Sequence, residues 1–173
     1  MGNYIGETQA IDFKKISLEI RKRTYKCLGV GSGRVVFDLE DGNVVKVAKN
    51  KRGIAQNEAE YKIALENDSL LLAKIFGASE KYTFLIMEKA KKIHDISKVW
   101  EYFHVKSNME LYRIKELQDI CKKNNLEIKD FGRAVNWGQI TETPIIIDYG
   151  FTQQVRRRYY MSPASRFFKK LLG

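Results

Sequence analysis

The sequence predicts an α+β fold, with a small sheet and one helix in the first half of the chain and a mostly helical second half. Two observations lead to this prediction. Runs of β-branched residues flank an Asp-Gly turn at Gly42, and apolar residues recur every three or four positions in residues 53–66 and 109–123. The 173 residues suffice for one domain or for two small lobes around a cleft. We place the division between residues 1–88 and residues 89–173.

The first elements in chain order are an amphipathic helix and a hairpin. In residues 8–23, apolar residues recur at roughly helical spacing between lysines and arginines, which predicts a helix that packs on the first half. Residues 35–39 and 44–48 are β-branched runs separated by Glu-Asp-Gly-Asn, where Asp-Gly can supply the positive φ angles of a tight turn. These two runs predict the strands of a hairpin.

A second helix is predicted over residues 53–66, opened by Gly53, because apolar residues are spaced among polar ones. Strand-like segments follow at residues 72–76 and 82–87. Residues 89–108 show no clear period, and we expect them to cross from the first half to the second.

The second half begins with a predicted helix over residues 109–123, whose apolar residues recur every three or four positions. A glycine-containing loop is expected at residues 130–138. It is followed by a short apolar strand at residues 144–147, which ends at Asp148. The chain contains no internal repeat.

The composition is that of an ordinary globular protein and makes global disorder improbable. Hydrophobic residues make up 44% of the chain and charged residues 30%, with only 2 prolines. The longest apolar runs, such as residues 84–87 and 144–147, are far shorter than the roughly 18 to 20 residues that span a bilayer. Residues 1–20 are charged where a secretory signal has an apolar core. We therefore expect no membrane span and a cytoplasmic location.

The formal net charge of +10 is concentrated at the ends of the chain. Residues 153–173 contain no acidic residue and interleave basic with aromatic side chains. These are Arg156, Arg157, Arg158, Arg166, Lys169 and Lys170, with Tyr159, Tyr160, Phe167 and Phe168. The segment is either a solvated basic helix whose aromatic residues pack on the core, or a surface for nucleic acid, an anionic membrane or an acidic partner.

The cysteines and histidines form no recognisable motif. Cys27 and Cys121 are isolated, without a CxxC pattern or a histidine at metal-binding spacing, so we expect both to be buried reduced thiols. His94 and His104 also lack a partner at the spacing of a nucleophile or a metal site. We expect them on the polar surface or as satisfied core groups.

Residues 29–33, Gly-Val-Gly-Ser-Gly, lie between strand-like segments and are a candidate phosphate site. Because glycines lack a Cβ atom, backbone N–H groups beside them can approach phosphate oxygens closely. The spacing is neither GxGxxG nor that of the Walker motif, and glycine-rich hairpins also serve as purely structural turns. The segment alone leaves both roles open.

Lys46 is a single charged residue in an apolar strand, Val-Val-Lys-Val-Ala. It must point to solvent by simple alternation or face a cleft. Its distance from the glycine-rich segment is similar to that of the strand lysine of protein kinases, a resemblance that would place Lys46 in a cleft beside phosphates. A buried ammonium group needs a carboxylate partner, because its desolvation is costly. The helix at residues 53–66 offers Glu58 and Glu60 on different faces, and we predict Glu60.

Taken together, these segments resemble the protein kinase superfamily, in particular the minimal protein-kinase-like proteins of bacteria and their phages. The matching stretches, in the expected order, are LGVGSGRVVF, VVKVAKN, GIAQNEAE, FLIMEKA, KDFGRAVNWG and PIIIDYG, and they extend from Leu28 to Gly150. The resemblance implies a bilobal fold with a small antiparallel sheet and a helix in the first lobe. It further implies a hinge at residues 87–90, a reduced, mostly helical second lobe, and MgATP between the lobes.

The resemblance also implies roles for individual residues. Lys46, held by Glu60, would bind the α- and β-phosphates of ATP, and Asp130 would accept or orient the proton of the acceptor hydroxyl. Asp148 and Asn136 would hold Mg²⁺, although Asp148 is alternatively a turn residue that ends its strand. The other nucleotide contacts would come from Gly29, Gly31, Ser32, Gly33 and Arg34 at the phosphates and from the backbone of Glu88 to Ala90 at the adenine edge.

Three departures from the family pattern bear on function. Asp130 follows Ile-Lys instead of a His-Arg pair, and Asn136 lies six residues after it instead of five, so either the loop has one insertion or Val135 occupies the metal-ligand position. Arg34 stands where a third glycine is expected, where it either crowds or contacts a phosphate. Only 23 residues follow Gly150, too few for an activation segment and the helices that dock a protein substrate, so we expect no protein-substrate recognition of the usual kind.

Three functions remain open on the sequence alone. The first is a Mg²⁺-dependent phosphotransferase that moves the γ-phosphate of ATP to a hydroxyl acceptor. The second is a catalytically impaired pseudokinase that binds or regulates another macromolecule. The third is a basic nucleic-acid-binding protein whose kinase-like features are coincidental. The sequence identifies neither the acceptor nor the oligomeric state.

Overall fold

The chain forms two antiparallel sheets and a set of helices in residues 11–161, the part that the computed structural model describes. The larger sheet contains, in spatial order, β1 (Cys27–Val30), β2 (Arg34–Asp38), β3 (Asn43–Ala48), β5 (Phe84–Glu88) and β4 (Ile75–Ala78). The smaller sheet contains β6 (Lys91–Lys92), β7 (Trp137–Ile140) and β8 (Thr143–Ile146). The α-helices are α1 (Phe13–Arg21), α2 (Lys51–Leu65), α3 (Ser97–Tyr102), α4 (Asn108–Leu111), α5 (Lys115–Asn124) and α6 (Gln153–Tyr159).

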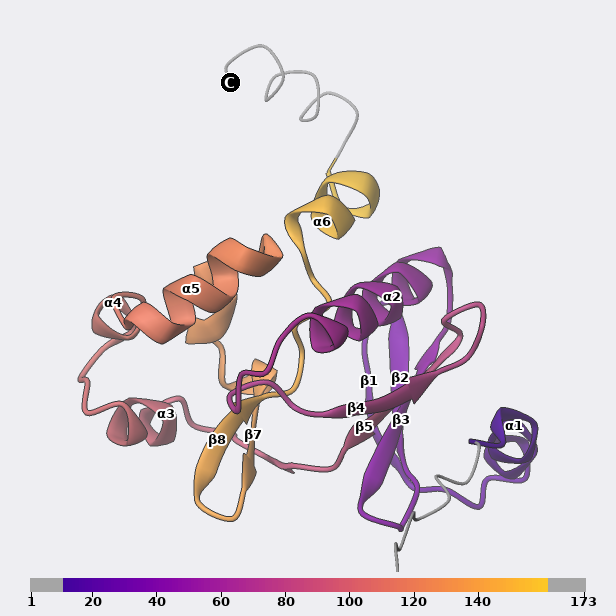
Figure 1. The fold of residues 1–173 in the computed structure, drawn as a ribbon. Coiled ribbons are helices and arrows are strands. Elements are labelled where there is room, and N and C mark those ends of the chain that lie inside the picture. The colour runs from indigo at the N-terminus through magenta and orange to yellow at the C-terminus, as the bar shows by residue number, and fades with distance from the viewer. Residues whose placement is uncertain (1–10, 162–173) are drawn as a thin grey trace, which may run out of the picture.

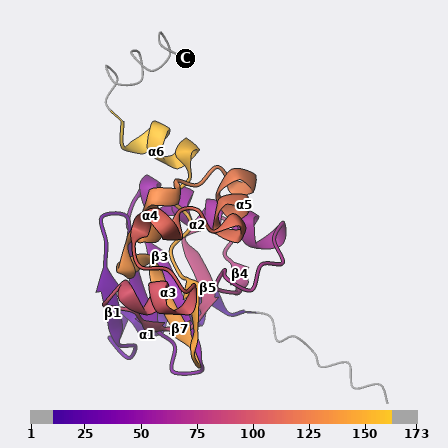
Figure 2. The same ribbon diagram turned by 90° about the vertical axis from the view of Figure 1, so that its left-hand side faces the viewer.

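The N-terminal half, residues 11–88, and the C-terminal half, residues 89–161, lie side by side (Figure 1). The five-stranded sheet carries α2 on one face, and the small sheet lies beside it with α3, α4 and α5. Helix α6 stands at the top of the molecule in both views, beyond α2 and α5 (Figures 1 and 2). The predicted α+β class is confirmed, whereas the C-terminal half contains a sheet that the prediction of a mostly helical half did not include.

The predicted hairpin is formed by β2 and β3. The register pairs Phe37 with Val45 and Val36 with Lys46. Gly42 at the turn has a φ of 88°, a value that favours glycine. Because successive side chains of a strand point to opposite faces of the sheet, Val45 and Lys46 lie on different faces, and both are buried.

Helix α2 begins two residues before the predicted start. Its N-cap is Asn50, whose side chain accepts hydrogen bonds from the backbone N–H groups of Arg52 and Gly53. Gly53 is therefore inside the first turn and does not open the helix. The buried face of the helix carries Asn57 and Glu60, two polar residues with no exposed surface.

Helix α1 covers less of the chain than the predicted helix at residues 8–23, and residues 8–10 of that prediction lie outside the described part. Asp12 caps the helix by accepting a hydrogen bond from the N–H of Lys15 at 2.9 Å. The rings of Phe13 and Phe84 stack with centroids 6.1 Å apart, which fixes α1 against the end of β5.

The predicted strand at residues 72–76 is displaced towards the C-terminus. Strand β4 occupies Ile75–Ala78, whereas Leu72 forms a parallel bridge with Ile146 of β8. In this bridge the N–H of Ile146 donates to the carbonyl of Leu71 at 2.6 Å, and the N–H of Ala73 donates to the carbonyl of Ile146 at 3.0 Å. The segment before β4 therefore joins the two halves.

The helix predicted over residues 109–123 is interrupted, and α4 and α5 take its place. Ile114 lies between them with ψ of 117°, an extended value that no α-helix contains. Leu111 and Leu117 are nevertheless both fully buried. The spacing of the apolar residues therefore predicted the buried positions correctly but not the break between the two helices. The predicted loop at residues 130–138 consists of two short 3₁₀ helices, Ile128–Gly132 and Ala134–Asn136, followed by the start of β7.

The core is continuous between the two halves. It includes Val44 and Met87 from the large sheet, Ile63 from α2, and Trp137 and Ile146 from the small sheet. The indole N–H of the buried Trp137 donates to the carbonyl of Phe131 at 2.8 Å, so the burial of its polar atom is compensated.

The cysteine prediction is half right. Cys121 is buried and free, but the free Cys27 is exposed because it lies on β1, an edge strand. His94 and His104 are both exposed, in agreement with the first of their two expected positions. Between residues 11 and 161, no helix has the length and the apolar character needed to cross a bilayer.

Candidate functional site

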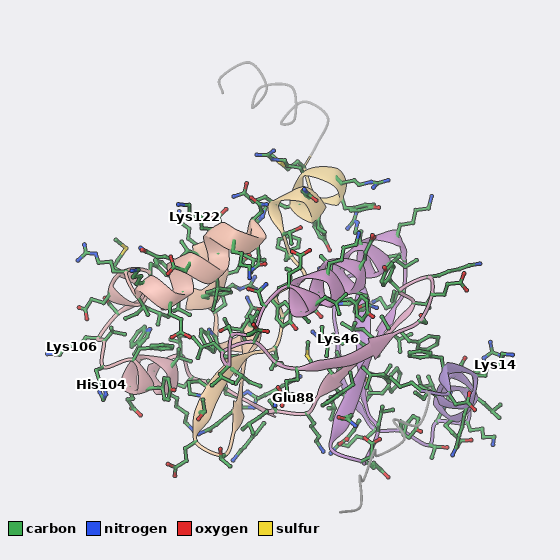
Figure 3. All side chains as sticks on the ribbon, viewed as in Figure 1. Lys14, Lys46, Glu88, His104, Lys106 and Lys122 are labelled. Carbon is green, nitrogen blue, oxygen red and sulfur yellow. The ribbon has the colours of Figure 1, made fainter. Side chains whose placement is uncertain are left out.

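A cavity of about 560 Å³ lies between the large sheet and the C-terminal half. Figure 3 labels Lys46 and Glu88 in the middle of the molecule, whereas Lys14, Lys106 and Lys122 lie at its periphery. The volume falls within the range of pockets for small ligands. The predicted residues that line it are Gly29, Gly31, Ser32, Gly33, Arg34, Lys46, Glu88, Ala90, Asn136 and Asp148.

The glycine-rich turn between β1 and β2 is docked on the beginning of α2. The carbonyl of Gly33 accepts from the N–H of Lys49 at 2.8 Å, and the carbonyl of Ser32 accepts from the side-chain amide of Asn50 at 3.1 Å. A Cβ atom on Gly33 would lie 3.0 Å from the backbone nitrogen of Gly53, so the close approach requires glycine.

The same turn leaves two donors for a ligand. Within residues 11–161, the backbone N–H groups of Ser32 and Gly33 make no hydrogen bond, and both residues line the cavity. Lys49 lies beside them and donates from Nζ to the carbonyl of Gly31 at 2.7 Å. Unpaired N–H groups next to a cation form the kind of surface that binds phosphate oxygens.

Lys46 is buried and pairs with Glu60, as predicted. Its Nζ lies 2.7 Å from Oε2 of Glu60 and also donates to the carbonyl of Ile147 at 2.6 Å. Glu58 instead pairs with Lys62 on the exposed face of α2. Burial lowers the pKa of Lys46, and the charge of Glu60 opposes that effect only in part.

Glu60 connects the two halves through its second oxygen. Oε1 accepts hydrogen bonds from the backbone N–H groups of Tyr149 at 3.2 Å and Gly150 at 3.1 Å. The carboxylate has no exposed surface, so each of its contacts compensates for lost hydration. Gly150 packs against the backbone of Gln56 in α2, where a Cβ atom would collide.

Arg34 lies between Glu60 and Asp148, with only 7% of its surface exposed. Its Nη1 is 3.0 Å from Oε2 of Glu60 and 3.3 Å from Oδ1 of Asn57, and its Nη2 is 2.7 Å from Oδ1 of Asp148. Burial acts to lower the pKa of Arg34, but the two carboxylates outweigh it and the pKa is raised. Arg34 is therefore a permanent cation at the centre of the site.

Asn57 supports this arrangement and was not among the predicted residues. Its side-chain amide nitrogen donates to the carbonyls of Lys46 at 3.2 Å and Tyr82 at 2.9 Å, while its oxygen accepts from Arg34. It lies three residues before Glu60, on the same face of α2. An asparagine three residues before Glu60, on the same buried face of the helix, is the signal that could have identified it.

Asp148 follows β8 and lines the floor of the cavity, with its side chain 42% exposed. Partial burial acts to raise its pKa, but the charges of Arg34 and Lys46 outweigh burial and hold the pKa below its usual value. Asp148 is thus an ionised carboxylate whose Oδ1 is already bound by a guanidinium group.

The sequence left open whether Asn136 or Val135 occupies the metal-ligand position, and both residues line the cavity. Val135 is 65% exposed and offers no ligand atom, whereas Asn136 is buried. The side-chain nitrogen of Asn136 donates to the backbone carbonyl of Asp130 at 2.8 Å, and no residue between 11 and 161 donates to its side-chain oxygen. Of the two residues, Asn136 is the one with a free oxygen at the cavity.

Asp130 does not line this cavity. It lines an adjoining one of about 240 Å³, which shares Ser32, Asn136 and Asp148 with the larger cavity. Its Oδ2 lies 3.1 Å from Nη2 of Arg156 in α6. Burial raises the pKa of Asp130, although Arg156 opposes the shift.

Arg156 brings α6 onto the adjoining cavity, and no sequence motif pointed to this contact. Its guanidinium lies 4.5 Å from the ring centroid of Phe151. Tyr160 also lines the cavity, and its hydroxyl is 3.5 Å from Oγ of Ser32. Within the described end of the basic segment, Tyr160 therefore packs against the N-terminal half and Phe151, while Arg166, Phe167, Phe168, Lys169 and Lys170 lie outside the described residues.

The backbone groups predicted to contact adenine differ in their availability. The N–H of Glu88 donates to the carbonyl of Lys74 at 2.9 Å and is occupied. The N–H and the carbonyl of Ala90 make no hydrogen bond with any residue of the described range, and Ala90 lines the cavity. Ala90 is therefore the better candidate for an in-plane contact with a base.

One oxygen of the predicted magnesium ligand Asp148 is already occupied in this arrangement. Asp148 and Asn136 offer oxygen atoms of the type that Mg²⁺ binds beside substrate phosphates. However, Oδ1 of Asp148 is held by Arg34, and a divalent cation on this carboxylate would lie against the guanidinium. Within residues 11–161, no three histidine, cysteine, aspartate or glutamate side chains converge on a possible metal position.

No protein-family model matches the chain, and no curated protein is similar to it in sequence.

Proposed function

We propose that the chain is a protein-kinase-like ATP-binding protein and that ATP binds in the 560 Å³ cavity. The observation that carries this proposal is the buried Lys46–Glu60 pair, 2.7 Å apart, beside a glycine-rich turn with two unpaired N–H groups. Burying an ammonium group is costly unless a carboxylate or a ligand pairs with it. Lys46 pairs with Glu60 and also lines the cavity, where a ligand could contact it.

The kinase-like arrangement proposed here has two lobes. The N-terminal lobe corresponds to the five-stranded sheet with α1 and α2, and the C-terminal lobe to the small sheet with α3–α6. The support is the order of the elements, with the lysine on β3, its glutamate on α2, and Asp148 two residues after the end of β8. Residues 89–90, which connect β5 and β6, lie within the expected hinge at residues 87–90.

The cavity offers different chemistry to the two ends of ATP. Leu28, Val36, Val44 and Met87 line it with apolar side chains, which suits a purine ring. Lys46 and the N–H groups of the glycine-rich turn suit the phosphates, and the free backbone groups of Ala90 suit the edge of the base.

The direct test is the thermal and chemical stability of the chain with and without ATP. A ligand at about 100 times its dissociation constant adds about 2.7 kcal/mol to the free energy of unfolding. Lys46→Met should abolish this gain, whereas Lys98→Met, which removes an exposed charge on α3, should leave it unchanged. If saturating ATP does not stabilise the unmodified chain, the proposal is wrong.

Phosphoryl transfer is a second candidate, favoured by the position of Asp130. The carboxylate lies in a cavity that adjoins the first and shares Asn136 and Asp148 with it. In such a transfer an acceptor hydroxyl forms the new O–P bond, the bond to the ADP leaving group breaks, and Asp130 takes up the hydroxyl proton. Magnesium on Asp148 and Asn136 belongs to this candidate and stays a prediction.

The pairing of both carboxylates with arginines favours a binding module over an active transferase. Asp130 is engaged by Arg156 and Asp148 by Arg34, so neither is free in this arrangement. Incubation with γ-labelled ATP separates the candidates: label transfer that is lost in Asp148→Asn would establish catalysis. ATP binding without any transfer would leave a nucleotide-binding module.

A macromolecular partner remains a prediction that rests on the basic charge of the chain. Arg157 and Arg158 are exposed on α6. If nucleic acid is the partner, affinity for a generic duplex should decrease steeply with salt and weaken when residues 156–158 are replaced. Salt-independent or absent duplex binding would exclude that partner.

A further inference from the structure

The proposed nucleotide site contains a cation of its own at the position where a metal ion is expected. Arg34 is nearly fully buried and contacts two carboxylates and one amide oxygen, with Nη2 2.7 Å from Asp148 and Nη1 3.0 Å from Glu60. A guanidinium group does not lose its proton in proteins, so this charge is permanent.

We propose that Arg34 takes the place of a divalent metal at Asp148, so that the cavity binds nucleoside triphosphates without magnesium. The inference rests on the proposed ATP site and specifies how its phosphates are held. Guanidinium groups bind phosphate oxygens through directed hydrogen bonds, which makes arginine a suitable substitute for a metal at this point.

The charges around Arg34 are already balanced. Arg34 and Lys46 carry the positive charges, and Glu60 and Asp148 carry the negative ones, all in direct contact. A divalent cation on Asp148 would have to displace the guanidinium from its acceptor or lie next to it, and like charges at that distance repel. A nucleotide, in contrast, brings negative charge to two cations that are already fixed in position.

Arg34 keeps a donor for such a ligand. Its contacts to Glu60, Asn57 and Asp148 use Nη1 and Nη2. Its Nε makes no hydrogen bond to any residue between 11 and 161, and Arg34 lines the cavity, so Nε is the donor with which it could contact a ligand. Arg34 can therefore contact a phosphate while it holds the two carboxylates.

The lining of the whole cavity supports an anionic ligand that arrives without a metal. Five basic residues and two acidic residues line it. They are Arg34, Lys46, Lys89, Lys91 and Lys92, against Glu88 and Asp148. Glu60 and Asp148 balance Arg34 and Lys46, and Asp38 pairs with Lys89 at 2.6 Å, so the remaining positive excess is that of Lys91 and Lys92 over Glu88. This excess attracts a free triphosphate more strongly than its less negative magnesium complex.

The experiment is a titration of the full chain with ATP by isothermal calorimetry, once with excess EDTA and once with excess Mg²⁺. We expect dissociation constants that agree within about threefold. Adenosine, which lacks phosphates, should bind at least about tenfold more weakly than ATP in EDTA. A dissociation constant that rises more than about tenfold in EDTA overturns the inference but leaves the proposed ATP site intact.

Variants of Arg34 test the residue itself. Arg34→Met frees Asp148, and we expect ATP binding in EDTA to weaken at least about tenfold, while Mg²⁺ restores part of it. Arg34→Lys retains a positive charge and should keep binding largely independent of metal, which covers the case that the methionine variant does not fold. Arg21→Met, an exposed arginine on α1, is the matched control and should behave as the unmodified chain.

A metal titration provides a readout without nucleotide. Mn²⁺ binding followed by electron paramagnetic resonance should detect no site that depends on Asp148 in the unmodified chain. A tight Mn²⁺ site that is lost in Asp148→Asn would overturn the inference. Failure of ATP to bind in both EDTA and Mg²⁺ would instead overturn the proposed function, and the inference with it.

Discussion

Two carboxylates of the candidate site each hold an arginine, but the two pairs differ in how they are built. Arg34 is 8% exposed in its side chain and contacts Asp148, Glu60 and Asn57. Arg156 is 36% exposed, and the contact that it makes with a carboxylate is the one to Asp130 at 3.1 Å. Asp148 is itself 42% exposed, but its arginine belongs to a buried network that includes Glu60 and Asn57. The second pair is a single, partly exposed contact between α6 and the 3₁₀ helix at Ile128–Gly132, in which Asp130 is 20% exposed.

The difference indicates which part of the site is fixed by the fold and which part can change. A buried, multiply paired charge is costly to disrupt, because its partners lose their compensation together. A half-exposed ion pair contributes about 0–1 kcal/mol and can be exchanged for water or a ligand. We therefore infer that the Asp148 side is preformed and that the Asp130 side is adjustable.

The largest effect is expected when Glu60, the centre of the buried network, is removed. Glu60→Ala leaves Lys46 and Arg34 without a shared partner, and we expect a loss of about 3–5 kcal/mol in the free energy of unfolding. The measurement is urea denaturation monitored by circular dichroism. Glu58→Ala, on the same helix but exposed, should change stability by about 0.5 kcal/mol or less. Equal losses for both variants would contradict the role of Glu60.

The next test concerns the amide that connects the network to the sheet. Asn57→Ala removes hydrogen bonds to the carbonyls of Lys46 and Tyr82 and to Arg34. Because Asn57 has no exposed surface, water cannot replace these hydrogen bonds, and we expect a loss of about 1–3 kcal/mol in the free energy of unfolding, again from denaturation curves. Gln154→Ala on the exposed face of α6 is the control. A neutral Asn57→Ala would mean that the network does not depend on the amide.

The adjustable pair is tested by Arg156→Met. We expect a loss of about 0–1 kcal/mol in stability, because the pair is partly solvated. The same change should raise the pKa of Asp130 further, since Arg156 opposes its upward shift. Arg157→Met, the exposed neighbour, should alter neither quantity. A loss as large as that of Glu60→Ala would remove the distinction between the two pairs.

The smallest expected effect is the pH dependence of folding stability. It has opposite signs for Asp148 and Asp130. The pKa of Asp148 is below its usual value of 3.8, so its contribution to stability is present above about pH 4 and is lost as the pH falls through the lowered value. The pKa of Asp130 is above 3.8, so stability decreases as the pH rises from about 4 through the raised value.

Carboxyl ¹³C titrations by nuclear magnetic resonance measure both values. Asp148→Asn and Asp130→Asn assign the two resonances, and each should remove the corresponding part of the pH dependence of stability. Shifts in the same direction for both carboxylates would contradict the comparison.

Local rules were sufficient for the parts of the fold and site that depend on near neighbours in sequence. The hairpin around Gly42 follows from turn chemistry, and the choice of Glu60 over Glu58 follows from the face of α2 that meets the strand. These features involve short-range pairing or a single buried charge that must find a partner.

The features that the sequence did not predict depend on contacts between distant segments. Lys91 and Lys92 form a strand because they pair with Gln139 and Gly138, nearly fifty residues away, and nothing local indicates a strand there. Arg34 and Asp148 lie 114 positions apart, and the spacing of neither motif reveals that they are partners. The isolation of Cys27 from any CxxC or histidine partner predicts a buried thiol, but its strand lies at the sheet edge, where it is exposed.

The docking of the glycine-rich turn on α2 has a consequence for the kinetics of binding. The carbonyls of Ser32 and Gly33 are tied to Asn50 and Lys49, so the turn is not a flap that closes over a ligand. A preorganised loop loses little conformational entropy when it is occupied. We therefore expect single-step association at a rate that is proportional to ligand concentration, with little change in the amide hydrogen exchange of α2.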